Sequence, residues 1–143
     1  MTVLAGAGNS FGGLGVQGGY YLAAGRVSVF AGVGYYPGDP DDDRLPSGVA
    51  GAVGARGFTK GLRHRGFLEL SVAPITNAWA TRDFDLFDGA ILYGPSAQGG
   101  YQFVGSTGFT IMISVGVGYA RWSKYDLSYT SVTGGLGLGY TRR

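Results

Sequence analysis

Two charged segments of the chain contain residue types that could bind a ligand. Residues 39–43 read Asp-Pro-Asp-Asp-Asp, and carboxylate oxygens are the ligands that Ca²⁺ and Mg²⁺ prefer. The segment lacks the glycine and terminal glutamate of an EF-hand loop, so a solvated loop tip formed by Asp41, Asp42 and Asp43 is favoured and no metal site is predicted. Residues 60–65, Lys-Gly-Leu-Arg-His-Arg, are basic but contain no aromatic residue, so we also predict no nucleic-acid partner.

Aromatic residues form a third group of candidates. They fall in two segments: Trp79, Phe84 and Phe87 in one, and Trp122, Tyr125 and Tyr129 in the other. Exposed rings dominate binding hot spots, so these segments could present a recognition surface for an unidentified surface ligand. The alternative, which we favour, is that the rings form an interfacial girdle or pack the loops together.

The residues needed for catalysis are scarce. The chain has no Cys, and His64 is its single histidine. A nucleophile needs a nearby base, and neither Ser114 nor Ser128 has an evident partner for a catalytic triad. We therefore predict no catalytic residue, no enzymatic activity and no cofactor.

The composition limits the class of protein to which such residues could belong. Glycine accounts for 29 of 143 residues and charged residues for 14%, against usual shares of about 7% and about 25%. This is not the surface of an ordinary soluble domain, and a hydrophobic content of 45% argues against disorder. We expect one domain over residues 1–143, and we expect that any signal peptide has been removed, since no complete one is present.

Two long stretches, residues 1–25 and 89–120, carry no charge. Their length alone would suggest transmembrane helices. Each stretch contains eight glycines, however, and each glycine costs a helix about 1 kcal/mol relative to alanine. Strands are therefore favoured.

Strict alternation of residue types supports strands, most clearly over residues 109–120. Ten residues at about 3.4 Å each, tilted by about 45°, span roughly 24 Å, close to the ~25 Å apolar band of outer-membrane barrels. Small or weakly polar residues occupy the opposite face. We predict that the large apolar row faces lipid; it comprises Phe109, Ile111, Ile113, Val115, Val117 and Tyr119.

The same alternation, less regular elsewhere, predicts eight strands joined alternately by short turns and long loops. This spacing is typical of an all-β, antiparallel, up-and-down transmembrane β-barrel. If residues 1–8 were not a strand, seven strands would remain and closure would fail. The predicted strands are 2–8, 11–22, 27–36, 48–58, 66–75, 89–103, 108–120 and 132–142.

Charged residues are almost excluded from these strands, since only Arg56 and Glu69 fall within strand interiors. Both lie on the glycine-rich face, which indicates that this face lines a narrow, filled lumen. Because they flank one turn, we predict a lumenal salt bridge between them; the alternative is a separate polar partner for each. The larger residues predicted to face the lumen are Gln17, Tyr21, Phe30, Arg56, Glu69, Gln98, Gln102 and Met112.

The two ends of the predicted barrel differ in charge. The three long loops hold eight acidic and four basic residues, a net charge of −4. We expect the opposite end, with a net charge of +6, to contact anionic inner-leaflet lipid or a periplasmic polymer. Its basic residues are Arg26, Lys60, Arg63, Arg65, Arg142 and Arg143.

The chain resembles the OmpA/OmpX-like eight-stranded outer-membrane barrels over essentially its whole length. Residues 134–142, Gly-Gly-Leu-Gly-Leu-Gly-Tyr-Thr-Arg, are similar to the C-terminal strand that such proteins present to the barrel-assembly machinery, and residues 94–103 are similar to a membrane strand that leads into a periplasmic turn. The resemblance implies an outer-membrane location in a Gram-negative-type bacterium. It also implies outer-membrane lipid and the assembly machinery as partners, but no particular activity.

Several functions fit this architecture. The leading hypothesis is a structural or surface-interaction role carried by the long loops. The alternatives are a narrow solute or ion channel in which Arg56 and Glu69 select the solute, and an adhesin that binds through residues 76–88. A soluble ligand-binding barrel is the competing fold.

Overall fold

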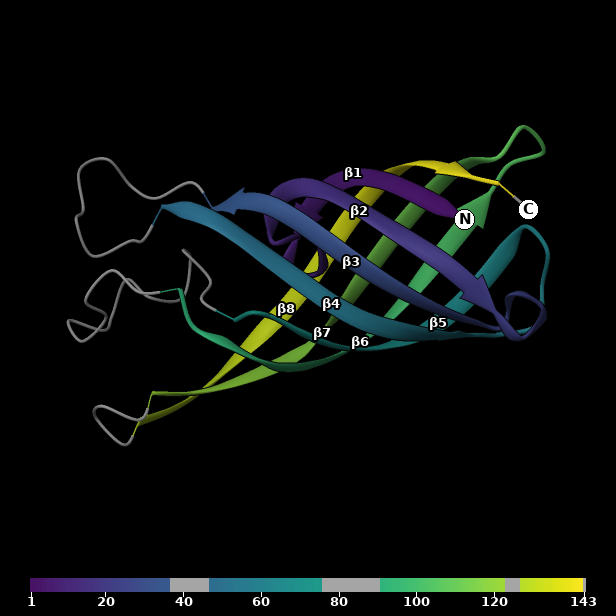
Figure 1. The fold of residues 1–143 in the computed structure, drawn as a ribbon. Helices are drawn as coiled ribbons and strands as arrows, with labels where there is room; N and C mark the ends of the chain where they lie inside the picture. Colours follow the sequence, from purple (N-terminus) through teal and green to yellow (C-terminus); the bar gives the residue numbers. More distant parts are fainter. Residues whose placement is uncertain (37–46, 76–90, 123–126, 143) are drawn as a thin grey trace.

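The protein is an all-β closed barrel. The computed structural model describes residues 1–36, 47–75, 91–122 and 127–142, without the side chains of residues 122 and 127. These residues form eight antiparallel strands in sequential order, and the last strand pairs with the first (Figure 1). The strands are β1 (Thr2–Gly8), β2 (Gly13–Leu22), β3 (Val27–Tyr36), β4 (Gly48–Phe58), β5 (His64–Pro74), β6 (Tyr93–Val104), β7 (Phe109–Trp122) and β8 (Leu127–Thr141).

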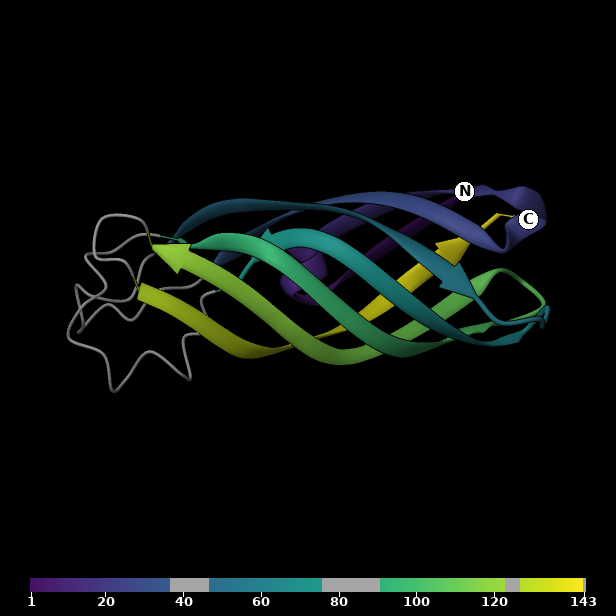
Figure 2. The ribbon, with the colours of Figure 1, turned by 90° about the horizontal axis from the view of Figure 1, so that it is seen from below.

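The strands run up and down, so that the connections gather at the two ends of the barrel. The short connections from β2 to β3, β4 to β5 and β6 to β7 lie at the same end as both termini (Figure 2). The segments between β3 and β4, β5 and β6, and β7 and β8 leave from the opposite end. We call the end that holds the short connections and both termini the short-turn end, and the opposite end the long-loop end.

Closure depends on the strand that the sequence left least certain. β1 pairs with β2 along its whole length and also with residues 135–141 of β8. The backbone groups of β1 therefore have partners on both sides, as a closed barrel requires. Residues 2–8 form a true strand, and the predicted eight-stranded, antiparallel, closed barrel is confirmed.

Several of the predicted strand boundaries were wrong. β5 begins at His64, two residues before the predicted start, and β8 begins at Leu127, five residues before it. β6 begins at Tyr93 and not at residue 89. These boundaries fall where the apolar alternation fades, and pairing with a neighbouring strand decides where each strand starts.

The connection from β1 to β2 folds into the barrel. A short 3₁₀ helix, η1 (Asn9–Phe11), replaces the predicted strand start at residue 11, and all three of its residues are buried. Gly8, Gly12 and Gly13, which flank it, have φ values of 126°, 70° and 109°. Residues that carry a Cβ atom rarely adopt such φ values. These glycines let the chain leave the wall and turn inward, and the η1 coil is visible inside the strands in Figure 2.

Candidate functional site

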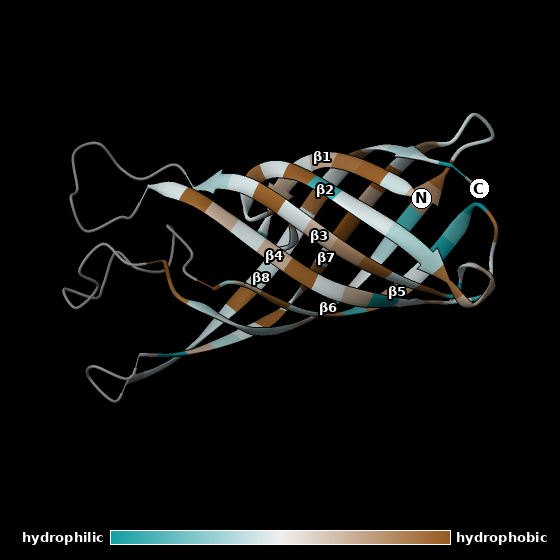
Figure 3. Cartoon of the chain, viewed as in Figure 1, coloured by the Kyte–Doolittle hydropathy of each residue, from teal (hydrophilic) through white to brown (hydrophobic). Residues whose placement is uncertain are grey.

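The barrel has an apolar outside and a polar inside. The predicted lipid-facing row on β7 points outward, with exposures from 38% at Ile111 to 64% at Val115. Figure 3 shows the apolar residues alternating with paler ones along the strands. The outer row consists of Phe109, Ile111, Ile113, Val115, Val117 and Tyr119, and similar rows on the other strands are also exposed.

Arg56 and Glu69 form the ion pair that the sequence predicts. They are directly opposite each other in the register of β4 and β5, and Arg56 Nε lies 2.6 Å from Glu69 Oε2 with both side chains almost fully buried. The Arg56 guanidinium also stacks on Phe30, 4.1 Å from its ring centre, and lies 5.4 Å from the centre of the Phe67 ring. The charge buried in the lumen is thus paired and also contacts the faces of two aromatic rings.

Glu69 also holds η1 in place. Its Oε1 accepts hydrogen bonds from Ser10 Oγ at 2.5 Å and from Ser71 Oγ at 3.2 Å. Gln17 Nε2 on β2 donates to the backbone oxygen of Ser10 at 2.7 Å. We call Ser10, Gln17, Arg56, Glu69 and Ser71 the Glu69 network; it joins the inward turn to three strands.

Phe11 fills the middle of the lumen. Its side chain is fully buried and packs in a cluster with Leu4, Phe67 and Met112. The strands leave room for it through glycine: an added Cβ on Gly137 would lie 2.6 Å from Phe11 Cζ. The glycine content of the inner face therefore has a specific packing function, since small residues at these positions make space for η1.

Two further predicted lumen residues, Gln98 and Gln102, lie on β6 and have buried side chains. Gln98 Oε1 accepts a hydrogen bond from Ser114 Oγ at 2.7 Å, so this serine hydroxyl is engaged with an amide. Gln102 Oε1 accepts from Arg65 Nη2 at 2.7 Å and from the Tyr21 hydroxyl at 3.2 Å. Gln98 is the register partner of Glu69, whereas the bonds of Gln102 form a second group of polar contacts nearer the end of β6 that leads into the short turn.

Arg65 belongs to the interior, although the sequence analysis assigned it to a short turn. It is the second residue of β5 and only 9% exposed. Its guanidinium lies over the Phe58 ring at 4.4 Å and the Tyr21 ring at 4.9 Å. The signal was available, because the inward alternation of Glu69 and Phe67 reaches Arg65 when it is extended by two more residues.

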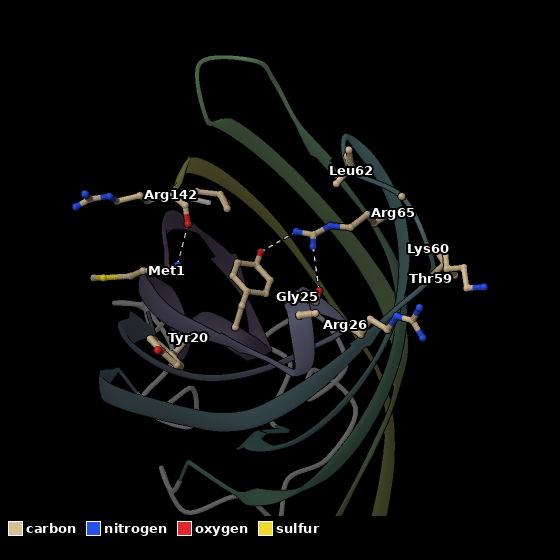
Figure 4. A pocket seen from close by; sticks show the side chains of 13 residues that line it. Met1, Tyr20, Gly25, Arg26, Thr59, Lys60, Leu62, Arg65 and Arg142 are labelled. Atoms are coloured by element: carbon tan, nitrogen blue, oxygen red, sulfur yellow. Dashed lines mark hydrogen bonds between the residues drawn. The ribbon is translucent and has the colours of Figure 1, made fainter.

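A cavity of about 590 Å³ opens at the short-turn end. Arg65 and Tyr21 line it and are joined by a hydrogen bond of 2.9 Å from Arg65 Nη2 to the Tyr21 hydroxyl. Figure 4 shows the Arg65 side chain reaching into this space. We call this space the mouth cavity. Among the residues around it are Tyr20, Gly25, Arg26, Lys60, Leu62 and Arg142.

Most of the surface residues predicted to act in the long loops lie outside the described part of the chain. This holds for Asp41, Asp42, Asp43, Trp79, Phe84 and Phe87. Trp122 is the last residue of β7. Arg121, predicted in a loop, lies within β7, because that strand and β8 pair further toward the long-loop end than expected.

His64 lies on the outside of the barrel. Its Nδ1 is hydrogen-bonded to the Tyr101 hydroxyl, and its ring lies 5.0 Å from the ring of Phe103. Within the described residues, no group of three or more His, Cys, Asp or Glu side chains is placed to hold a metal ion.

Fold and interior together define a class: a closed, up-and-down antiparallel barrel with an apolar exterior and a lumen filled by buried polar and charged side chains and by an apolar cluster. Comparison of the chain with models of protein families, with curated proteins and with solved structures found no match to any of them. Among the described residues, no helix is long and apolar enough to cross a membrane.

Proposed function

We propose that this protein is a small integral outer-membrane β-barrel of Gram-negative type, OmpA/OmpX-like in architecture. Its role is structural or surface-interacting, carried by the long-loop end, and it involves no catalysis. The observation that carries the proposal is the polarity of the wall: outward side chains are large and apolar, whereas charged and amide side chains are buried inside.

Lipid is the solvent that suits this exterior. Leu68 and Leu70 of β5 are 75% and 69% exposed, and large apolar residues on the other strands are also exposed. A soluble barrel would place such residues inside and charged residues outside. Closure also pairs the backbone groups of neighbouring strands, which the hydrocarbon core demands because no water is present there.

The filled lumen favours the structural role over the channel. Phe11 and Met112 are fully buried inside the barrel, and the Glu69 network occupies further space in the lumen. Solute would have to displace these side chains. In planar bilayers we therefore expect no steady conductance; a steady conductance that changes on Arg56→Ala would instead support the channel.

Membrane insertion is tested by folding in detergent. We expect the protein to stay in solution only with detergent or lipid, and to migrate differently on a gel before and after boiling, as folded membrane barrels do. A chain that folds and remains monodisperse in buffer alone would refute the membrane location and support the soluble barrel.

A charge placed on the outer wall gives a quantitative test. Val115 lies midway along β7 and is 64% exposed. In lipid vesicles we expect Val115→Lys to lower the free energy of unfolding by about 2–4 kcal/mol, because lysine near the bilayer midplane is costly. The measurement is a urea titration of vesicle-inserted protein.

The matched control for this test is Leu62→Lys. Leu62 is 77% exposed but lies in the short connection between β4 and β5, so the same substitution should cost about 0–1 kcal/mol. Near-zero effects of both substitutions would contradict the membrane location, since a water-facing wall tolerates lysine.

The partners follow from the same proposal. Leu136, Leu138 and Tyr140 on β8 all point outward, each about half exposed, which supports outer-membrane lipid as the surrounding phase and the barrel-assembly machinery as the transient partner. A surface ligand, if there is one, binds at the long-loop end. Deletion of residues 76–88 followed by measurement of cell or partner binding tests the adhesin alternative.

A further inference from the structure

We propose that the mouth cavity binds a phosphate group, presented by an anionic lipid headgroup or by a free phosphate compound. The shared chemistry is a compact, doubly or singly charged oxyanion. The inference goes beyond the proposed function, and only its lipid form rests on it. Three properties of the cavity carry it: its charge, the unused donors of Arg65 and its apolar rim.

The charge around the mouth cavity has one sign. Four cationic side chains line it, and among the described residues no Asp or Glu does; the cations are Arg26, Lys60, Arg65 and Arg142. Figure 4 shows Arg26 and Lys60 on the same side of the mouth, with Arg142 on the other. The charged end of Arg65 reaches into the cavity, whereas those of Arg26, Lys60 and Arg142 lie at its rim; together these charges give the mouth a positive potential that favours a bound anion.

Arg65 provides hydrogen-bond donors at a fixed position within this positively charged cavity. A guanidinium carries five N–H donors in a planar fork that matches phosphate oxygens. Arg65 donates to the Tyr21 hydroxyl, to Gln102 Oε1 and, at 3.3 Å, to the backbone oxygen of Gly25. Its Nε, although buried, has no hydrogen-bond partner among the described residues.

The contacts that Arg65 does make keep it in place. Two aromatic rings, those of Tyr21 and Phe58, lie within 5 Å of the guanidinium carbon. The bond to Gly25 ties it to the turn between β2 and β3, whose Ala24 also lines the cavity. A cation held in this way requires little reorganisation when an anion binds.

The rim of the mouth cavity is apolar where it meets the outer wall. Tyr20 and Leu62 line the cavity and are 62% and 77% exposed. In a membrane-inserted barrel these side chains lie beside the glycerol and upper acyl region of a lipid whose phosphate enters the cavity. The volume of about 590 Å³ is ample for a phosphate with an attached polar group.

The experiment uses the folded protein in non-ionic detergent micelles and follows backbone amide NMR shifts of Gly25 and Arg65. One arm adds inorganic phosphate, and the other adds phosphatidylglycerol, with phosphatidylcholine as the zwitterionic comparison. We expect saturable shifts at these residues in at least one arm. A response to phosphate assigns a free phosphate compound, whereas a response to phosphatidylglycerol alone assigns the lipid headgroup.

Variants separate a site from a general effect of charge. Arg65→Gln should weaken binding at least about tenfold, because it removes a charge-assisted donor. Arg26→Gln, on the exposed rim, should weaken it about fivefold and keeps the test valid if Arg65→Gln fails to fold. The matched control is Arg121→Gln, which removes the same charge at the opposite end of the barrel and should leave affinity unchanged.

Three results would overturn the proposal: no saturable shift in either arm, equal binding of phosphatidylcholine and phosphatidylglycerol with none of phosphate, or equal losses from Arg26→Gln and Arg121→Gln. Membrane insertion is measured separately, by the dependence of the folded protein on detergent. If the phosphate site fails but the protein still inserts into membranes, the proposed function stands. If phosphate binds but the protein does not insert, the proposed function fails and the phosphate site stands.

Discussion

Replacing Glu69 with alanine should lower the free energy of unfolding by about 3–5 kcal/mol, because it leaves the Arg56 guanidinium buried without a counter-charge. The pair is 2.6 Å apart and almost fully removed from solvent. The loss also removes the acceptor of the Ser10 hydroxyl, which is one of the hydrogen bonds that hold η1 in place. Urea titration in micelles or vesicles, followed by circular dichroism, measures the effect.

A double-mutant cycle separates the charge pair from the other hydrogen bonds of Glu69. Glu69→Gln keeps an acceptor for Ser10 and Ser71 but removes the charge, and Arg56→Met removes the guanidinium while filling similar volume. We expect the double variant to be more stable than the sum of the two single losses predicts, by about 1–3 kcal/mol. Additive losses would show that the two residues do not interact.

The second large effect concerns the packing of Phe11 inside the barrel. Phe11→Ala should cost about 3–5 kcal/mol, the range for removing a fully buried phenylalanine and leaving a cavity. Gly137→Ala in the native barrel should cost about 1–3 kcal/mol, because the new Cβ would lie 2.6 Å from Phe11 Cζ and that ring is fully buried.

The two substitutions should compensate each other. In the Phe11→Ala background, Gly137→Ala meets no ring, so its cost should fall to near zero or reverse. Gly139→Ala is the matched control on the same strand and the same face. Its Cβ would lie 2.0 Å from the backbone oxygen of Val3 and 2.8 Å from the Cα of Leu4, so its cost should persist in both backgrounds.

These measurements use the same unfolding titrations as the Glu69 cycle. If Gly137→Ala cost the same with and without the Phe11 ring, the glycine would serve the strand backbone and not the packing of η1. If the cost of Gly139→Ala also disappeared in the Phe11→Ala background, the barrel would have relaxed as a whole, and the proposed local contact would be wrong.

The alternation of residue types predicted most of the barrel because one period governs the whole wall. Once Leu68 and Leu70 point outward, Glu69 must point inward, and the turn between β4 and β5 then places it opposite Arg56. Two features of the sequence were enough to predict this pair: the alternation of residue types with a period of two, and the midpoint of the turn between β4 and β5. Arg65 falls in the predicted turn only because the predicted strand, 66–75, starts two residues too late.

The inward turn of η1 could not be predicted in this way. Asn9, Ser10 and Phe11 have no periodic pattern, and their placement depends on Glu69, which is 59 residues from Ser10 in the sequence. Positive φ values at Gly8 and Gly12 permit the turn but do not require it. Only the closed barrel brings the partners together, so the lumen was predicted to be filled by wall side chains and not by a short helix.

The pairing of β1 with β8 has a consequence for biogenesis. These strands stand at opposite ends of the chain, yet Thr2 and Thr141 are register partners with hydrogen-bonded hydroxyls. Until synthesis reaches β8, every partial sheet carries two open edges that invite pairing with other chains. The seam therefore closes only when both terminal strands are present, and its closure removes the two open edges at once.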